Sequence, residues 1–176
     1  MRTGILLSLF TLAAPASASD IFVGPGDSIQ VAIDSAVDGD RIICAAATYT
    51  ETINFNGKLV EVIGFNGSSA TFIDGSGGTS PTVRFTNGET SASSLSGFTI
   101  LGGTGVLGGG VVIVGSSPTI SDCKIKFGER GSGGGISCVN GGATLTNVII
   151  NHSVALGGEG AGLYCLDSTV DLAEVT

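Results

Sequence analysis

Residues 108–113, Gly-Gly-Gly-Val-Val-Ile, decide the fold because their pattern returns twice further along the chain. The pattern is a glycine cluster followed by a short apolar run, and it occurs again at residues 133–138 (GGGISC) and 160–165 (GAGLYC). The third positions of these clusters are Gly110, Gly135 and Gly162, which recur at nearly equal intervals. Because an internal period of about 20 to 50 residues marks solenoids, propellers and other repeat arrays, we expect one of these architectures.

A second, independent landmark has the same period. Short runs that begin with an apolar residue start at Leu95, Ile120, Leu145 and Leu172, so their intervals match those of the glycine clusters. The repeats contain short β-branched runs bounded by Gly, Ser, Asn and Pro, without an extended helical pattern. The frame of a leucine-rich repeat is missing, and a propeller blade of about 40 to 45 residues is too long. We therefore expect short parallel strands stacked coil upon coil at about 4.8 Å.

Alternation along these strands assigns side chains to the inside or the outside of the stack. Five columns are expected to point inward: Val83, Val111, Ile136 and Leu163; Phe85, Ile113, Cys138 and Cys165; Leu95, Ile120, Leu145 and Leu172; Phe98, Cys123, Val148 and Val175; Ile100, Ile125 and Ile150. Two columns are expected to point outward: Arg84, Val112, Ser137 and Tyr164; Thr99, Lys124, Ile149 and Thr176. A further column falls where the chain bends, and a polar side chain can hydrogen-bond its neighbour there: Gly97, Asp122, Asn147 and Glu174.

Two local features stand out against the regular repeat. The glycine clusters are expected to supply corners with positive φ. The connection from Phe85 to Leu95 is longer than its counterpart from Ile113 to Ile120. Because insertions in a repeat array map to loops on one face, this connection marks a face where function could lie.

Residues 20 to about 80 are expected to start the solenoid. Residues 27–30 (DSIQ) fit a capping box in which Asp27 caps a helix and Gln30 reaches back. Apolar residues follow at helical spacing and end at residues 38–40 (DGD), which predicts an amphipathic helix of about ten residues: Ile29, Ala32, Ile33, Ala36 and Val37. Such a helix suits a lid over the open end of the stack. The first coils are then expected at residues 41–44, 53–55, 59–63 and 71–73, with turns at 56–57, 66–67 and 74–75.

The amino-acid composition argues against some classes of function. The chain has 176 residues, 30 of them glycine, with 42% hydrophobic and only 12% charged residues, so it has ample material for a core. Its formal net charge of −8 gives no electrostatic footprint for nucleic acid. Trp is absent and only two Tyr occur, so aromatic platforms for sugars or single-stranded nucleic acid are expected to be scarce.

The N-terminal segment 1–18 has the order of a secretory signal peptide. Arg2 precedes the apolar residues 5–14, and the small residues Ala16, Ser17 and Ala18 follow. The apolar run is too short to span a bilayer, which takes about 20 residues. We expect cleavage after Ala18, giving a secreted or cell-surface protein with a signal peptide at 1–18 and a β-helix domain at 19–176, of which 20–47 form the N-terminal cap.

The chain resembles a known family. The segments SIQVAIDSAVDGDRI, TYTETINFNGK, FIDGSG, GFTI, SSPTISDCKI and GGGISC look like the secreted right-handed parallel β-helix repeat proteins of the pectin-lyase-like superfamily, which include bacterial surface proteins with polymorphic outer-membrane repeats. The resemblance covers about residues 21 to 176. It implies an all-β, right-handed parallel β-helix, here of about five coils with a short N-terminal capping helix. Since the superfamily contains lyases, hydrolases, esterases and adhesins, it does not fix an activity.

A lyase of this superfamily combines carboxylates that bind Ca²⁺ with a basic residue that abstracts a proton. The nearest candidates here are Asp122, Lys124 and Arg130, accompanied by Lys126 and Glu129. No second carboxylate aligns beside Lys124 on the adjacent coils, so we interpret this cluster as surface charge. The Asn-Thr-Asp and Asp-Asp motifs of the superfamily's hydrolases are absent from the sequence.

The other chemistry-bearing residues also have structural interpretations. Asp122 and Glu174 lie two coils apart in one column, where Asn147 between them favours a structural ladder. His152, the only histidine, has no nucleophile or carboxylate at a recognisable spacing. Cys138 and Cys165 share an inward column, which leaves open either a strained disulfide or two small buried thiols. No metal site and no cofactor are expected.

The sequence thus predicts an exported scaffold, surface or adhesion module, without catalytic activity in this segment. The alternative is a polysaccharide lyase or glycoside hydrolase whose catalytic coils lie beyond residue 176. Expected partners are extracellular polysaccharide or cell-surface components, and nucleic acid is not expected. The last coil stops at Thr176 without a polar cap, so we expect continuation of the chain or end-to-end association there.

Overall fold

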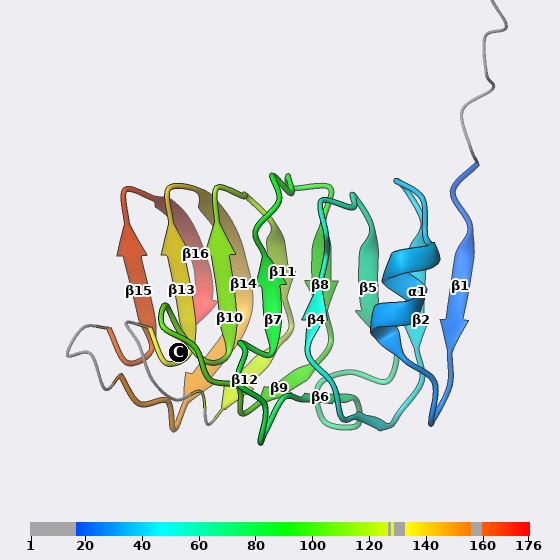
Figure 1. The fold of residues 1–176 in the computed structure, drawn as a ribbon, viewed down its shortest axis with the longest axis horizontal. Helices are drawn as coiled ribbons and strands as arrows, with labels where there is room; N and C mark the ends of the chain where they lie inside the picture. The colour runs from blue at the N-terminus through cyan, green and yellow to red at the C-terminus, as the bar shows by residue number, and fades with distance from the viewer. Residues whose placement is uncertain (1–16, 127, 129–132, 156–159) are drawn as a thin grey trace, which may run out of the picture.

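The fold is an all-β parallel solenoid of about 6 turns with one short helix. The computed structural model describes residues 17–126, 128, 133–155 and 160–176. Figure 1 shows the strands side by side along the long axis, from β15 and β16 at one end to β1 at the other. The predicted fold class is confirmed, with about one turn more than the five expected.

Each turn of the solenoid contributes strands to three walls, and every pairing between successive turns is parallel. The first wall contains β1 (Asp20–Val23), β2 (Arg41–Cys44), β5 (Glu61–Gly64), β8 (Ser94–Ser96), β11 (Thr119–Ser121), β14 (Gly142–Asn151) and β16 (Thr169–Val175). The second wall contains β3 (Thr48–Tyr49), β6 (Phe72–Asp74), β9 (Thr99–Leu101) and β12 (Lys124–Lys126), and joins the first through β14. The third wall contains β4 (Ile53–Asn54), β7 (Val83–Phe85), β10 (Val111–Val114), β13 (Ile136–Val139) and β15 (Leu163–Leu166).

The predicted inward columns form the core as far as β14, whereas on the last coil Cys165 and Leu172, also predicted to point inward, are exposed. Val111 pairs with Val83 on one side and with Ile136 on the other, as the repeat period requires. The rings of Phe55 and Phe85 stack with centroids 4.2 Å apart. Burial of each such aliphatic or aromatic side chain contributes about 1.5 to 3 kcal/mol, so the columns are the main source of stability.

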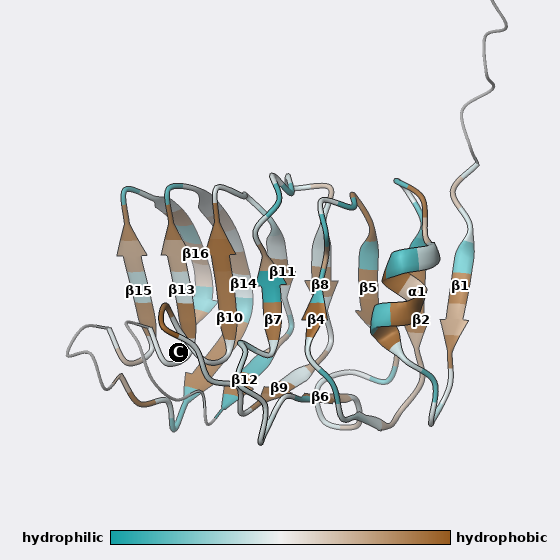
Figure 2. Ribbon diagram, in the orientation of Figure 1, coloured by the Kyte–Doolittle hydropathy of each residue, from teal (hydrophilic) through white to brown (hydrophobic). Residues whose placement is uncertain are grey.

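The outward columns differ from the prediction on the third wall, because Val112 is only 4% exposed and Ser137 is fully buried. The cause is the glycine-rich chain ahead of β10. A Cβ atom added to Gly108 would lie 3.2 Å from the Cβ of Ser137, so this loop lies against the outer surface of the wall. Figure 2 shows β10 apolar along its length, as burial on both faces demands. On the second wall Thr99 is buried as well, because its hydroxyl donates to the carbonyl of Ser68 in an adjacent loop.

The glycine clusters supply the expected left-handed backbone at two places, since Gly133 and Gly160 have φ of 85° and 56°, and their third positions serve another purpose. Gly110, Gly135 and Gly162 lie on successive coils without positive φ. A Cβ added to Gly135 would lie 2.5 Å from the carbonyl oxygen of Gly162 and would also collide with the side chain of Ile150. Gly110 and Gly135 are needed because one backbone packs directly against the next, whereas a Cβ at Gly162 would make only an ordinary contact with Ile150 at 3.8 Å.

Left-handed backbone also occurs in the bend column, where side chains are mostly polar. Gly97, Asp122, Asn147 and Glu174 have φ of 77°, 54°, 52° and 55°. The side-chain amide of Asn147 donates to Oδ1 of Asp122 at 2.7 Å. The predicted polar ladder at the bend is therefore confirmed. Gly, Asp and Asn tolerate the left-handed region, whereas Glu174 occupies it without that preference.

The helix α1 (Ile29–Ser35) is shorter than predicted and is capped differently. Ser28 is the N-cap, and its hydroxyl accepts the N–H of Val31. The carboxylate of Glu51, from the following coil, accepts the N–H groups of Ile29 at 2.7 Å and Gln30 at 3.1 Å. A full carboxylate at a helix N-terminus satisfies two free donors at once, which leaves no role for the predicted capping box.

The two residues of that predicted box bind elsewhere. Asp27 accepts the N–H of Gly24, and the side chain of Gln30 exchanges hydrogen bonds with the backbone of Asn54. The apolar face of α1 joins the core as expected through Ile29 and Ile33, which are fully buried, whereas Val37 lies past the helix and is exposed.

The insertion after β7 surrounds a buried carboxylate. Glu89 accepts the N–H of Gly57 from the preceding coil, the hydroxyl of Ser116 from the following coil and the N–H of Asn87, at 2.7 to 2.8 Å. Burial acts to raise the pKa of Glu89, but the N–H of Asn87, the hydroxyl of Ser116 and the N–H of Gly57 outweigh it and lower the pKa. The insertion predicted as a functional face thus ties three coils together.

The four cysteines are free thiols. Cys138 and Cys165 are in register on β13 and β15, as predicted, but they form no disulfide. Cys138 is buried and Cys165 is exposed. Burial raises the pKa of both Cys44 and Cys123 to about 12, so these two thiols are unreactive at neutral pH. The alternative of two small buried thiols therefore holds for Cys138 but not for Cys165.

Substitution of Asn147 tests the left-handed bend. Asn147→Gly and Asn147→Val both lose the hydrogen bond to Asp122, but only valine is strained at a φ of 52°. We expect the valine variant to be less stable than the glycine variant by about 1 to 3 kcal/mol, measured by urea unfolding. Equal stability of the two variants would show that the bend imposes no such constraint.

Replacement of Glu89 tests the role of the insertion. Glu89→Gln leaves the N–H donors of Asn87 and Gly57 facing an amide, so we expect a loss of about 1 to 3 kcal/mol at pH 7. Because the folded-state pKa of Glu89 is lowered, its contribution is present above the ordinary glutamate pKa and is lost as pH falls through the folded value.

The stability difference between wild type and Glu89→Gln should therefore shrink on acidification below about pH 4.3. Urea unfolding at a series of pH values measures it, and Glu61→Gln, whose side chain is half exposed, is the matched control. A difference that stays constant down to pH 2 would argue against an ionised Glu89 in the folded chain.

Candidate functional site

The structure describes two of the three catalytic candidates predicted from the sequence, Asp122 and Lys124. Lys124 is half-buried on β12, and its neighbours on the adjacent coils are Thr99 and Ile149, as expected from the columns. Asp122 lies at the bend, where its carboxylate accepts the amide of Asn147. Arg130 lies outside the described residues. No carboxylate therefore stands beside Lys124 along its column.

The remaining candidates also have local structural contacts. Glu174 lies two coils from Asp122 in the bend column, with Asn147 between them. His152 has a φ of 54°, and its Nδ1 lies 3.2 Å from Oδ1 of Asn151. Among the described residues, no group of three or more His, Cys, Asp or Glu side chains is placed to hold a metal ion. None of the helices in that part of the chain is long and apolar enough to cross a bilayer.

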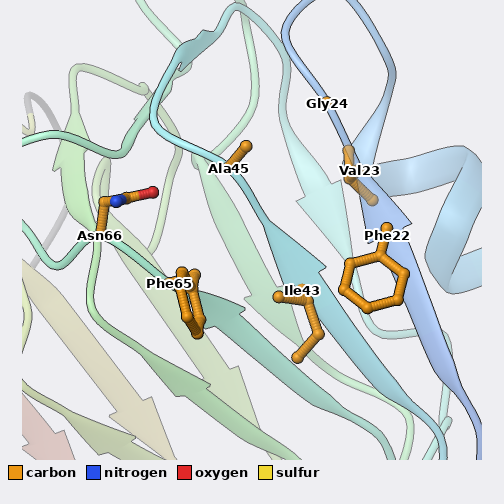
Figure 3. A pocket seen from close by; sticks show the side chains of 7 residues that line it. All are labelled: Phe22, Val23, Gly24, Ile43, Ala45, Phe65 and Asn66. Carbon is orange, nitrogen blue, oxygen red and sulfur yellow. The ribbon is translucent and has the colours of Figure 1, made fainter.

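The outer face of the first wall carries an apolar groove. Figure 3 shows Phe22 of β1 and Phe65, just after β5, on either side of Ile43 of β2. The groove has a volume of about 240 Å³ and is also lined by Val23, Gly24, Ala45 and Asn66. Phe22 is 75% exposed and Phe65 is 74% exposed. Two large aromatic side chains this exposed on one face are unusual unless they contact a partner.

The strand register places these residues. Phe22 pairs with Ile43, and Ile43 pairs with Ile63, so one outward column is apolar over three coils. Ile21, Ile42 and Val62 alternate with it and point inward. The outer face of β1, β2 and β5 is therefore apolar in this column, whereas the neighbouring outward column, Asp20, Arg41 and Glu61, is charged.

One side chain at the edge of the groove is polar. Oδ1 of Asn66 accepts the N–H of Ala46 at 3.1 Å, which orients the amide and leaves its N–H₂ group directed away from that contact. Figure 3 shows this side chain beside Phe65. The groove therefore combines two aromatic surfaces with one amide donor.

The same outer face continues as a ladder of hydroxyl groups. On β8, β11 and β14, each strand presents two Ser or Thr side chains outward, one in each of two columns: Ser94, Thr119 and Thr144; Ser96, Ser121 and Thr146. The columns are about 6.6 Å apart along the strand, and successive coils are about 4.8 Å apart. The second column continues the apolar one, since Ile63 pairs with Ser96.

Charge on this face is confined to its ends. Arg41 forms ion pairs with Asp20 at 3.3 Å and Glu61 at 3.9 Å on the first three coils. At the other end Asp171 pairs with Thr144. The six hydroxyls between these ends are neutral, half-buried or exposed, and regularly spaced. This arrangement suits an elongated, uncharged ligand better than an ionic one.

The sequence reasoning missed the groove because it looked for Trp and Tyr as aromatic platforms. The sequence does carry a signal: residues 21–23 (IFV), 42–44 (IIC) and 62–63 (VI) are apolar without interruption, where a strand facing water on one side alternates. The apolar residues that break this alternation are those of the outward column, Phe22, Ile43 and Ile63.

Comparison with protein-family models, with curated proteins and with solved structures finds no match to this chain. The fold is therefore established by the strand topology alone.

Proposed function

We propose that the chain is an exported, right-handed β-helix module of the pectin-lyase-like type that acts in surface binding or adhesion and holds a neutral glycan on the outer face of its first wall. The observation that carries the proposal is the exposed groove between Phe22 and Phe65. The proposal locates function in a binding surface, in keeping with the scaffold role expected from the sequence.

The chemistry of the groove favours a sugar. A pyranose ring has an apolar C–H face that packs against an aromatic ring, and hydroxyl groups around its edge that need hydrogen-bond partners. Phe22 and Phe65 supply the apolar surfaces, and the N–H₂ group of Asn66 supplies a donor at the edge.

The hydroxyl ladder extends the same site along the solenoid. Ser and Thr hydroxyls both donate and accept, so they complement sugar hydroxyls of either orientation. Thr144 and Thr146, the most exposed of the six, stand at the end of the ladder away from the groove. A chain of sugars that runs parallel to the long axis would meet one pair of hydroxyls per coil, with a spacing close to the length of one sugar unit.

The negative charge of the protein favours neutral glycans over acidic ones. The chain carries a formal net charge of −8, and its ladder has no cation to pair with an acidic sugar. The one arginine of this face, Arg41, is already paired with two carboxylates. A neutral glycan therefore binds without electrostatic repulsion, whereas polygalacturonate is repelled.

Native electrophoresis in gels that contain a soluble polysaccharide tests the proposal. We expect retardation by at least one neutral glycan among xyloglucan, mixed-linkage β-glucan and galactomannan, and none by polygalacturonate. Phe22→Ala or Phe65→Ala should weaken the Kd about tenfold, which corresponds to about 1.4 kcal/mol. Thr144→Val together with Thr146→Val should weaken it less, because each removes one hydroxyl without changing the volume.

Val106→Ala and Thr48→Val are the matched controls. Val106 is 91% exposed in a loop and Thr48 is exposed on the second wall, so neither substitution should affect binding. Failure of every neutral glycan to retard the chain, or retardation that survives both phenylalanine substitutions, would refute the proposed site. Release of new reducing or unsaturated ends from the polysaccharide would favour the alternative, a lyase or hydrolase.

A further inference from the structure

A buried carboxylate fixes the first described residues to the solenoid. Asp40, just before β2, is only 3% exposed. Its Oδ1 accepts both the backbone N–H and the hydroxyl of Ser19 at 2.9 Å, and its Oδ2 accepts the N–H of Val37 at 2.9 Å. Two of the three hydrogen bonds that the carboxylate accepts therefore come from one residue, Ser19.

Ser19 is held from its other side as well. Its carbonyl oxygen accepts the N–H of Arg41 at 2.8 Å, which is the first contact of the β1–β2 ladder. Ser17, Ala18 and Ser19 are exposed. The contacts that place the Ser19 nitrogen come from β2 and Asp40, not from the residues before it.

This position coincides with the cleavage site expected from the sequence. Hydrolysis of the Ala18–Ser19 bond consumes one water, breaks the C–N bond, and leaves a carboxylate on Ala18 and a protonated α-amino group on Ser19. We propose that Asp40 is the receiving site for this amino group, so that processing after Ala18 replaces a neutral hydrogen bond with an ion pair that fixes β1 to the first wall. The inference rests on the proposed export in one respect: export supplies the cleavage after Ala18 in the cell.

The surroundings leave Asp40 available for this cation. The N–H of Val37 and then the N–H and hydroxyl of Ser19 lower the pKa of Asp40, and the charge of Lys58 adds to them, while burial opposes. The Lys58 ammonium itself donates to the carbonyl of Ala36. Among the described residues, no lysine or arginine side chain forms an ion pair with Asp40.

The other charged groups nearby are already engaged. Arg41 pairs with Asp20 and Glu61, and the carboxylate of Asp38 accepts the N–H of Leu59. An α-amino group ordinarily has a pKa of about 8, and pairing with Asp40 raises it. The added stability is therefore present below about pH 8 and is lost as the pH rises through the raised value.

The test compares chains that differ only at the N-terminus. Specific removal of a fusion partner gives two forms with a free amine, one that begins at Ser19 and one that begins at Ala18. A third form begins at Ser19 and is acetylated at its N-terminus in a separate step. We expect the free Ser19 form to melt higher than the other two by roughly 2–4 °C at pH 6.5. This advantage should disappear above about pH 10 and in an Asp40→Asn background.

Equal melting temperatures of the three forms at pH 6.5, or an advantage that persists in Asp40→Asn, would overturn the inference. If Asp40→Asn does not fold, the acetylated form and the pH dependence still decide the question. N-terminal sequencing of exported protein is a separate measurement: a different first residue would contradict the proposed processing while leaving the melting comparison interpretable.

Discussion

Hydrogen bonding between strands one coil apart is the interaction on which the structure depends. Each strand finds its partner in the next turn of the solenoid, so residues one repeat apart in the sequence must be compatible as neighbours at about 4.8 Å. The inward columns, the polar bend and the stacked glycines all follow from this requirement. The Glu89 carboxylate shows it most clearly, because it connects Gly57, one coil before, with Ser116, one coil after.

The same requirement explains what could be predicted from the sequence. The period and the apolar alternation were enough to align Val83, Val111 and Ile136 and to place Asp122 at a bend, because these follow from one-dimensional spacing. Contacts between segments with no fixed spacing could not be read in this way. The capping of α1 by Glu51 and the loop of Gly108 over Ser137 depend on how coils sit in three dimensions.

The candidate site illustrates the same limit. Its residues belong to three coils, and Phe22 and Phe65 become neighbours only after β1, β2 and β5 stack in register. Regular stacking then turns single side chains into extended surfaces, an aromatic groove followed by two columns of hydroxyls. A solenoid can therefore build an elongated binding face from residues that carry no recognisable motif. The scaffold itself sets the spacing to which a repeating ligand must conform.

In-register stacking is the central claim, and thiol cross-linking measures it directly. In a Cys165→Ser background, Ser121→Cys with Thr146→Cys places two thiols on the outer face of adjacent coils, whereas Ser121→Cys with Ala173→Cys places them two coils apart. A short bifunctional thiol reagent should link the first pair rapidly and the second pair hardly at all. Equal linking of both pairs, or no linking of the first in the folded chain, would contradict the account.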